Sequence, residues 1–249
     1  EPTLPYYFYE PWDNSNSDEY DIGINIDELF ILNTSGIVTA RDGLVIDTDK
    51  NVLINRIIDF CSVKFTDDEI RCRYFGNKKD GKYLAGDSRG WSLHSARIQI
   101  MNNSHQNIIK QIAYRPFDNR YIYYHQDMVD WTRSNVMRNF NFDINYGLIS
   151  ARSNKSDTCD HFYITKYMSE TKCGERTTQS AVFPLFTYSV ALGKTIRNPN
   201  LKPEIVAEIS KKLGLPFAPY SDGGSTESFA PIDLLDYIYA VLHSPKYRE

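Results

Sequence analysis

The sequence predicts an α+β fold, in which a β-rich core has flanking helices and is followed by a C-terminal helical subdomain. Three observations support this prediction. Tyrosine-rich and β-branched segments fill the middle of the chain, an apolar stripe at helical spacing precedes them, and two well-capped helical segments follow them. The chain has 249 residues, of which 41% are hydrophobic and 14% aromatic. It is therefore large enough to form a core without disulfides or structural metals.

The first 35 residues are expected to form an extended arm. Prolines and aromatic residues without a helical period dominate residues 1–20, and only residues 26–32 favour a short helix. The segments 36–40 and 43–47 are rich in β-branched residues. We expect them to form two strands around a turn at Arg41-Asp42-Gly43, because Asp-Gly supplies the positive φ that a hairpin turn needs.

Three helices are predicted between residues 49 and 101. Apolar residues at helical spacing predict the first over residues 49–60, with Asp49 as its N-cap. Acidic residues from Asp67 onward are typical of the start of the second. The third is expected to begin at Asp87 or Ser88. Its predicted apolar face contains Trp91, His94, Ile98 and Met101.

The strongest strand signals lie between residues 108 and 125. Residues 108–114 and 120–125 are predicted as strands on either side of a turn at 115–118, because Pro116 cannot sit in a central strand. Further strands are expected at residues 144–152, 161–167 and 181–192, the last of them interrupted at Pro184.

Two helices are predicted near the C-terminus. Pro203 opens the first, which has glutamate in its first turn, lysines in its last turn and Gly214 at its end. An apolar face predicts the second over residues 231–243. We therefore divide the chain into an arm (residues 1–35), a core (residues 36–197) and a helical C-terminal subdomain (residues 198–249).

The basic residues are concentrated in the middle of the chain. Residues 51–200 contain 14 acidic and 21 basic residues, whereas residues 1–50 contain 11 acidic and 2 basic ones. The net charge of the middle is therefore +7, although that of the whole chain is −4. A basic block rich in arginine and aromatic residues suits a polyanion such as nucleic acid. Chance segregation of solvated charges is the alternative.

The sequence motifs of common enzymes are absent. There is no phosphate-binding loop, no dinucleotide-binding glycine motif, no nucleophile elbow, and no Asn- or Asp-Pro-Pro-Tyr tetrapeptide of adenine methyltransferases. The four cysteines lack metal-site spacing, so free thiols are a better interpretation than a site built from Cys159, His161 and Cys173. No apolar run approaches the roughly 20 residues of a membrane-spanning helix. We therefore expect no catalysis, cofactor or metal in this chain, and no membrane partner.

The segment 114–140 combines arginines and aromatic residues densely. Arg133 and Arg138 can bind phosphates or guanine edges, and Gln126 or Asn135 can pair with adenine. These residue types in one segment are typical of a DNA-binding surface.

Three charged residues of the same segment favour a structural role. Arg115, Asp118 and Arg120 flank the predicted turn at Pro116. We expect the Asp118 carboxylate to bond backbone amides or Arg115.

Two further basic segments are candidates for DNA contacts. One is the loop with Lys78, Lys79 and Lys82, together with the residues that follow it, and the other is the strand end at Arg152. Solvated surface loops are the alternative for both. The predicted DNA-binding residues are Lys78, Lys79, Lys82, Arg89, Trp91, Arg97, Gln126, Arg133, Asn135, Arg138, Arg152 and Asn154.

Six blocks of sequence occur in a characteristic order. They are Ser35-Gly36-Ile37-Val38-Thr39-Ala40-Arg41-Asp42, Trp91 with Ala96-Arg97, Tyr114-Arg115-Pro116-Phe117-Asp118-Asn119-Arg120-Tyr121 with Tyr123-Tyr124, Arg133 with Val136-Met137-Arg138, Phe183-Pro184-Leu185-Phe186-Thr187-Tyr188 and Asp236-Tyr237-Ile238-Tyr239-Ala240-Val241-Leu242-His243-Ser244-Pro245. In this order they resemble the C-terminal target-recognition (specificity) region of Type ISP and related single-chain restriction–modification enzymes.

The resemblance implies a target-recognition part of a bacterial, cytoplasmic polypeptide. It implies that the chain binds double-stranded DNA and positions it for adenine methylation and cleavage by other domains. S-adenosylmethionine, ATP and Mg would belong to those domains, and residues 1–35 would link the chain to a preceding methyltransferase domain. The alternative function is a protein-interaction or scaffolding module that packs against the sister methyltransferase domain.

Overall fold

The computed structural model describes residues 22–76, 82–103, 105–142, 144–153 and 161–248, and it confirms the predicted α+β fold. The helices are α2 (Ile26–Leu29), α3 (Asp42–Val45), α4 (Lys50–Cys61), α5 (Asp67–Phe75), α6 (Leu93–Ile100), α7 (His105–Ile108), α8 (Ser134–Met137), the 3₁₀ helix η1 (Arg138–Phe140), α9 (Pro203–Leu213), α10 (Pro231–Leu242) and α11 (Pro245–Arg248). The strands are β1 (Thr34–Ser35), β2 (Ile46–Asp47), β3 (Ile109–Arg115), β4 (Asp118–Tyr123), β5 (Gly147–Ala151), β6 (Phe162–Thr165), β7 (Met168–Ser169), β8 (Ser180–Pro184), β9 (Phe186–Ala191) and β10 (Lys194–Pro199).

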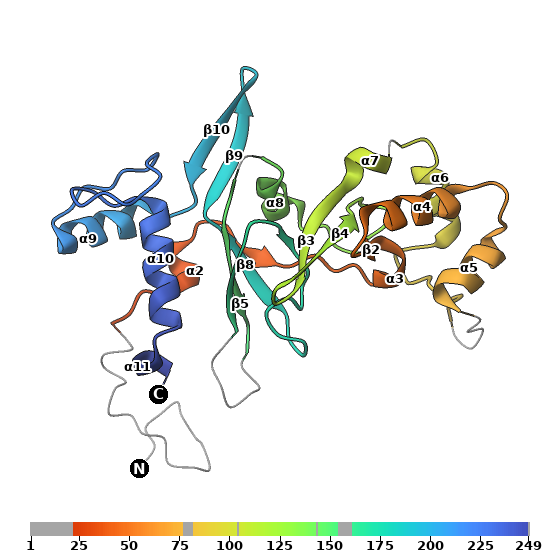
Figure 1. Ribbon diagram of the computed structural model, residues 1–249, viewed down its shortest axis with the longest axis horizontal. Helices are drawn as coiled ribbons and strands as arrows, with labels where there is room; N and C mark the ends of the chain where they lie inside the picture. Colours follow the sequence, from red (N-terminus) through yellow and green to blue (C-terminus); the bar gives the residue numbers. More distant parts are fainter. Residues whose placement is uncertain (1–21, 77–81, 104, 143, 154–160, 249) are drawn as a thin grey trace, which may run out of the picture.

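Sheets occupy the middle of an elongated molecule, and helices lie at both ends (Figure 1). The central sheet has the order β1-β8-β5-β6 and is antiparallel. The second sheet has the order β2-β4-β3-β7, in which only the β3–β7 pair is parallel. Strands β9 and β10 form a hairpin that projects from the body, whereas α3 to α6 lie beside the second sheet and α9 and α10 lie at the opposite end.

Several helices begin and end where local sequence signals place them. The Asp49 carboxylate accepts two backbone N–H bonds and caps α4, as predicted. Thr66 and Glu69 form a capping box at the start of α5. Pro203 starts α9, and Gly214 ends it in the left-handed conformation that glycine adopts without strain.

The predicted hairpin at residues 36–47 is wrong. Helix α3 replaces its turn, and the two flanking segments pair with distant parts of the chain. Ile37 forms a bridge with Glu170, Val38 forms one with Trp131, and β2 pairs with β4. These tertiary pairings override the local Asp-Gly turn signal, which acts on only a few residues.

Helix α6 is present, but it starts later than predicted and buries a different face. Ser92 caps it, and the Asp87 side chain accepts a bond from the N–H of Leu93, the first residue of the helix. The buried face consists of Leu93, Ala96, Arg97 and Ile100, while Ile98 and Met101 are exposed. The predicted stripe fails because Trp91, from which it was counted, lies before the helix.

The C-terminal boundary of the predicted core falls inside a strand. The predicted strand at 181–192 forms β8 and β9, with Pro184 at the end of β8, and the chain then turns at Leu192-Gly193 into β10, which the sequence analysis missed. Because β10 spans Lys194–Pro199, the division at 197/198 cuts it. That residues 36–197 and 198–249 fold as separate units stays a prediction.

Part of the predicted arm belongs to the folded body. Residues 1–20 lie outside the described residues, but residues 22–35 include α2 and β1 rather than a plain linker. Leu29 and Phe30 are buried there because they pack with the C-terminal helices and the central sheet.

Two large hydrophobic clusters, and a small one around Ala113 and Ile149, stabilise the described chain. The first lies between the second sheet and α3 to α6 and includes Leu44, Leu53, Ile57, Ile112 and Ile122. The second joins α2, α9 and α10 to the central sheet and includes Phe30, Leu148, Phe183, Val206 and Leu235. The segment that follows β1 connects the two sheets, and at Gly36 it passes very close to the backbone of Glu170. A Cβ placed on Gly36 would lie only 2.4 Å from the Glu170 carbonyl oxygen.

We expect Gly36→Ala to lower the free energy of unfolding by about 1–3 kcal/mol, because backbone atoms cannot rotate away from the added methyl group. Urea unfolding measures this loss. Gly43→Ala in α3 is the matched control, since no atom lies within 4 Å of its added Cβ. Equal unfolding midpoints for the two variants would contradict the close approach at Gly36.

Candidate nucleic-acid interface

The predicted DNA-binding residues fall into different environments. Lys78, Lys79 and Asn154 lie outside the described residues. Of the others, some are buried in the core, some are exposed on or near α8, and some are exposed elsewhere.

The structure assigns Arg97 and Trp91 to the core, which contradicts their predicted contact with DNA. The Arg97 side chain is 10% exposed and forms an ion pair with Asp67. Its remaining bonds, at 2.7–2.8 Å, go to the backbone carbonyls of Phe60, Ser62 and Phe65. The Trp91 indole N–H donates to the Asp127 carbonyl at 2.7 Å. Four of the five N–H donors of Arg97 and the single donor of Trp91 are thus used inside the fold, so neither side chain is available to hold a phosphate.

The charged residues around the β3–β4 turn are structural, as predicted. Arg120 donates to Asp118 at 2.7 Å, and this bond holds the pKa of Asp118 below its ordinary value. Arg115 donates to Glu170 at 2.5 Å. Both guanidinium groups also lie 4.1 Å from the centre of the Tyr114 ring. The expected partner of Asp118 was wrong: Arg120, not Arg115 or the backbone, binds the carboxylate.

Arg133 has an unusual conformation at the start of α8. Its backbone lies in the left-handed region (φ 52°, ψ 39°), which is costly for a residue other than glycine. Its guanidinium carbon lies 4.6 Å from the centre of the Trp131 ring, and Trp131 is 53% exposed. Its Nε is buried and has no hydrogen-bond partner within the described residues. Strain together with an unpaired donor is typical of a residue held for a ligand.

The backbone around Trp131 is fixed from two sides. The N–H groups of Asp130 and Trp131 donate to the Val38 carbonyl at 2.9 and 3.0 Å, and the Val38 N–H donates to the Trp131 carbonyl at 3.1 Å. The Tyr124 hydroxyl donates to the Thr132 carbonyl at 2.8 Å. The stacked indole and guanidinium therefore rest on a well-anchored loop.

The acidic residue next to Trp131 is paired inside the fold. Asp130 forms an ion pair with Arg41, whose guanidinium lies 4.0 Å from the centre of the Trp91 ring. Burial lowers the pKa of Arg41, an effect that the bond to Asp130 opposes. The carboxylate of Asp130 therefore does not cancel the positive charge of Arg133.

Other predicted residues lie close to Arg133 along the chain. Asn135 and Arg138 are exposed on α8 and η1. We call Trp131, Arg133, Asn135 and Arg138 the α8 surface. Gln126 and Arg89 are also exposed. They belong to two segments that the bond from the Trp91 indole to the Asp127 carbonyl joins.

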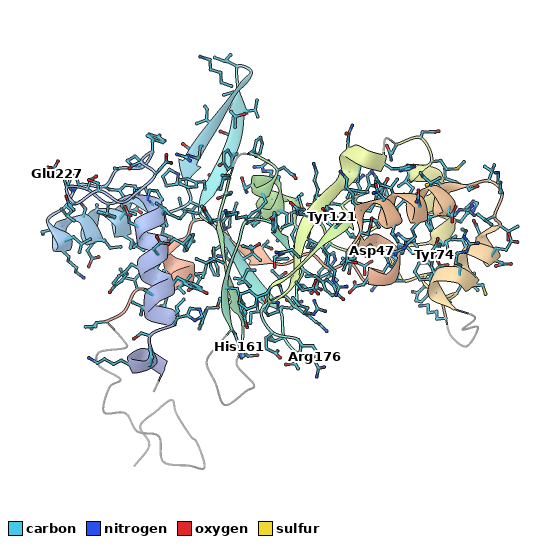
Figure 2. All side chains as sticks on the ribbon, viewed as in Figure 1. Asp47, Tyr74, Tyr121, His161, Arg176 and Glu227 are labelled. Carbon is cyan, nitrogen blue, oxygen red and sulfur yellow. The ribbon has the colours of Figure 1, made fainter. Side chains whose placement is uncertain are left out.

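Arg152 lies at the opposite end of the central sheet. Strand β5 starts at Gly147, which packs against Phe140 of η1, and it ends just before Arg152. A strand of this length spans roughly 17 Å. Figure 2 shows Arg176 and His161 at the same end of the sheet, away from the β9–β10 hairpin. Arg152 is therefore not part of the α8 surface. Lys82, exposed on the loop after α5, is not on that surface either.

Two of the free cysteines in the described residues, Cys61 and Cys173, are buried, whereas Cys72 is exposed. Burial raises the pKa of Cys61 and Cys173 to about 11, so both are protonated thiols at neutral pH. No three His, Cys, Asp or Glu side chains among the described residues gather as a metal site requires, and Cys159 lies outside those residues. None of the described helices is both long and apolar enough to cross a bilayer.

The family model of the Type ISP C-terminal specificity domain matches residues 28–249. The chain belongs to this family. The match includes the hydrophobic clusters and the α8 surface, and it confirms the resemblance carried by the six sequence blocks. No curated protein matches the sequence.

Solved structures confirm the fold of this specificity domain. The DrdV–DNA complex superimposes with a TM-score of 0.60 at 18% identity over 88% of this chain. The ATP-dependent Type ISP enzyme LlaBIII bound to DNA has a TM-score of 0.56 and 18% sequence identity over 90% of this chain. A nuclease-deletion mutant of the Type ISP enzyme LlaGI with a DNA substrate mimic has a TM-score of 0.54 and 20% identity over 90% of this chain. The chain spans only 20%, 14% and 19% of those chains, respectively.

Sequence reasoning overlooked two features near the specificity domain's α8 surface. Trp131 was not among the predicted site residues, although it lies two positions before Arg133. The β9–β10 hairpin was also missed. The available signal was charge, because residues 176–203 contain four basic residues and no acidic ones.

Arg133→Gly should leave the free energy of unfolding unchanged or raise it, because glycine accepts the left-handed conformation and the buried Nε is removed. Arg97→Ala should lower it by about 2–4 kcal/mol, because Asp67 and three carbonyls lose their donors. Urea unfolding of both variants checks this contrast. A similar loss in both would place Arg133 among the structural arginines.

Proposed function

We propose that this specificity domain recognises a sequence in duplex DNA through the α8 surface. The observation that carries the proposal is the state of Arg133: its guanidinium is stacked on an exposed indole, and its buried Nε has no hydrogen-bond partner among the described residues. A guanidinium held in one orientation can form two parallel bonds to a guanine edge or to a phosphate. The energetic cost of holding it would be offset when DNA binds.

The neighbouring side chains suit the two kinds of contact that recognition needs. Arg138 and Arg89 are exposed cations that can bind phosphates and fix the register of the domain on the duplex. Asn135 and Gln126 are exposed amides that can pair with adenine in the major groove. The presence of DNA in the three similar structures supports this assignment.

We further propose that the domain positions DNA for other parts of a longer, cytoplasmic bacterial polypeptide. The domain covers at most one fifth of the chains it resembles, which supports the assignment of other activities to other parts of the polypeptide. Adenine methylation and cleavage would then belong to those other parts, together with S-adenosylmethionine, ATP and Mg. The role of this chain would be binding alone, with no catalytic residue.

The alternative function, a module that packs on the sister methyltransferase domain, has one specific observation in its favour. An apolar groove of about 640 Å³ lies between α2, α9 and α10 and is lined by residues such as Ile24, Leu213 and Tyr237. A second domain could cover this groove. The groove lies on the C-terminal helices rather than on α8, so both functions can coexist on one chain.

Arg133→Lys and Arg133→Gly should weaken binding to a duplex selected from a random pool by tenfold or more, because neither residue can form the paired bonds of a guanidinium. Fluorescence anisotropy measures the affinity. Arg152→Ala, at the other end of the central sheet, is the matched control and should change it less than about twofold. Loss of binding in Arg152→Ala but not in the Arg133 variants would contradict the proposed surface.

Binding should also fall steeply with salt. Each neutralised phosphate contributes about 0.9 to the slope of log affinity against log salt concentration. Arg138→Ala should therefore reduce the slope by about 0.9 and weaken all duplexes alike. Affinity that is the same in about 50 and about 200 mM salt would argue instead for the protein-interaction function.

A further inference from the structure

The β9–β10 hairpin projects from the body of the described chain (Figure 1). Its six residue pairs run from Phe186–Pro199 at the base to Ala191–Lys194 beside the turn. Leu192 and Gly193 form the two-residue turn, and both have positive φ, at 50° and 73°. This turn geometry matches the twist of a hairpin but normally takes Asn or Gly at its first position, so leucine is costly there.

The base of the hairpin is anchored to η1. The Tyr188 ring is buried and stacks on Phe142, with a distance of 4.9 Å between ring centres. The Tyr188 N–H donates to the Asn139 side chain at 2.9 Å. The Arg197 guanidinium lies 4.5 Å from the centre of the Phe186 ring. The hairpin therefore projects from a rigid base that is continuous with the α8 surface.

The hairpin carries exposed apolar side chains at and near its tip. Leu192 is fully exposed, Val190 is 65% exposed and Ile196 is 43% exposed. None of the three belongs to a hydrophobic cluster of the described chain. A strained leucine at the apex of a projecting ribbon has no role in folding, which points to a partner that covers it.

The charge around the hairpin selects the kind of partner. Residues 176–203 contain no aspartate or glutamate, and Lys194 lies directly after the turn. Arg197 lies 4.0 Å from the exposed carboxylate of Asp222, so Lys194 is the cation beside the turn that can meet a phosphate. A phosphate backbone suits such a surface. A two-stranded ribbon also has the width that the major groove admits, and the apolar groups available there are the C5 methyl groups of thymine.

We propose that the β9–β10 hairpin enters the major groove of the target and that Leu192, with Val190 behind it, contacts thymine methyl groups. Lys194 binds a phosphate at the edge of the groove. This inference rests on the proposed function, because it adds a specific contact to the DNA surface that begins at Arg133. It makes Leu192 a specificity-determining residue and predicts thymine in the recognised sequence.

The experiment replaces each thymine of a selected duplex by uracil, one at a time, and measures the affinity of the 249-residue chain. At one or two positions the replacement should lower the affinity of the wild-type chain about fourfold, which corresponds to the free energy of burying one methyl group. Leu192→Ala and Leu192→Gly should bind the thymine duplex about fourfold or more weakly and should no longer distinguish uracil from thymine at those positions. The glycine variant keeps the turn, since glycine accepts positive φ.

Leu84→Ala is the matched control, because Leu84 is an exposed leucine in the loop after α5, outside the hairpin, the α8 surface and the apolar groove. It should bind the duplex normally and retain the sensitivity to uracil. Wild-type binding that is tight but indifferent to every uracil would overturn the inference and leave the proposed function intact. Sensitivity that persists in the Leu192 variants would overturn it as well, as would Leu192 variants that bind DNA normally but lose a protein partner. Failure to bind any duplex would overturn the proposed function together with this inference.

Discussion

The close approach of Gly36 to Glu170 is the contact on which the rest of the structure depends. At this point the chain leaves the central sheet, where the Gly36 N–H donates to the Ser180 carbonyl, and reaches the second sheet through Ile37. A side chain at position 36 would push these two backbones apart. One residue further on, the Val38 backbone exchanges hydrogen bonds with Trp131. The position of the α8 surface therefore depends on the segment that connects the two sheets.

The arginines of this chain divide into two groups according to what their donors bind. Arg97, Arg41 and Arg56 bond carbonyls and carboxylates of the fold, and they connect helices to strands or loops. Arg133 has no such bonds within the described residues and stacks on an exposed ring. Net charge does not separate these groups, because all of them carry one positive charge. The separation comes from hydrogen-bond accounting, since a donor already satisfied in the core gains little from a phosphate. The unpaired Nε of Arg133 and its left-handed backbone both agree with a side chain that is held in place for a ligand.

Local signals allowed much of the fold to be predicted, and tertiary contacts account for the failures. The cap at Asp49, the ends of α9 and the turn at Pro116 depend on a few neighbouring residues, so the sequence shows them directly. The hairpin at 36–47 failed because each half pairs with a strand or bridge far away in the chain. Within the site, Arg133, Asn135 and Arg138 were proposed from the sequence and are exposed or partly exposed in the structure. Arg97 and Trp91 were proposed as well but are buried. Their hydrogen-bond partners, Asp67 and Asp127, come from other elements and are not evident from the local sequence. Composition identifies basic and aromatic residues, but it does not show which of them the core uses.

Hydrogen–deuterium exchange of the chain, with and without a selected duplex, maps the surface that DNA covers without altering any residue. Binding of DNA to the α8 surface and the hairpin predicts slower exchange at residues 130–140 and at residues 189–197, with unchanged exchange in α10. Slower exchange confined to α9 and α10, or to the end of the central sheet around Arg152 and Arg176, would contradict it.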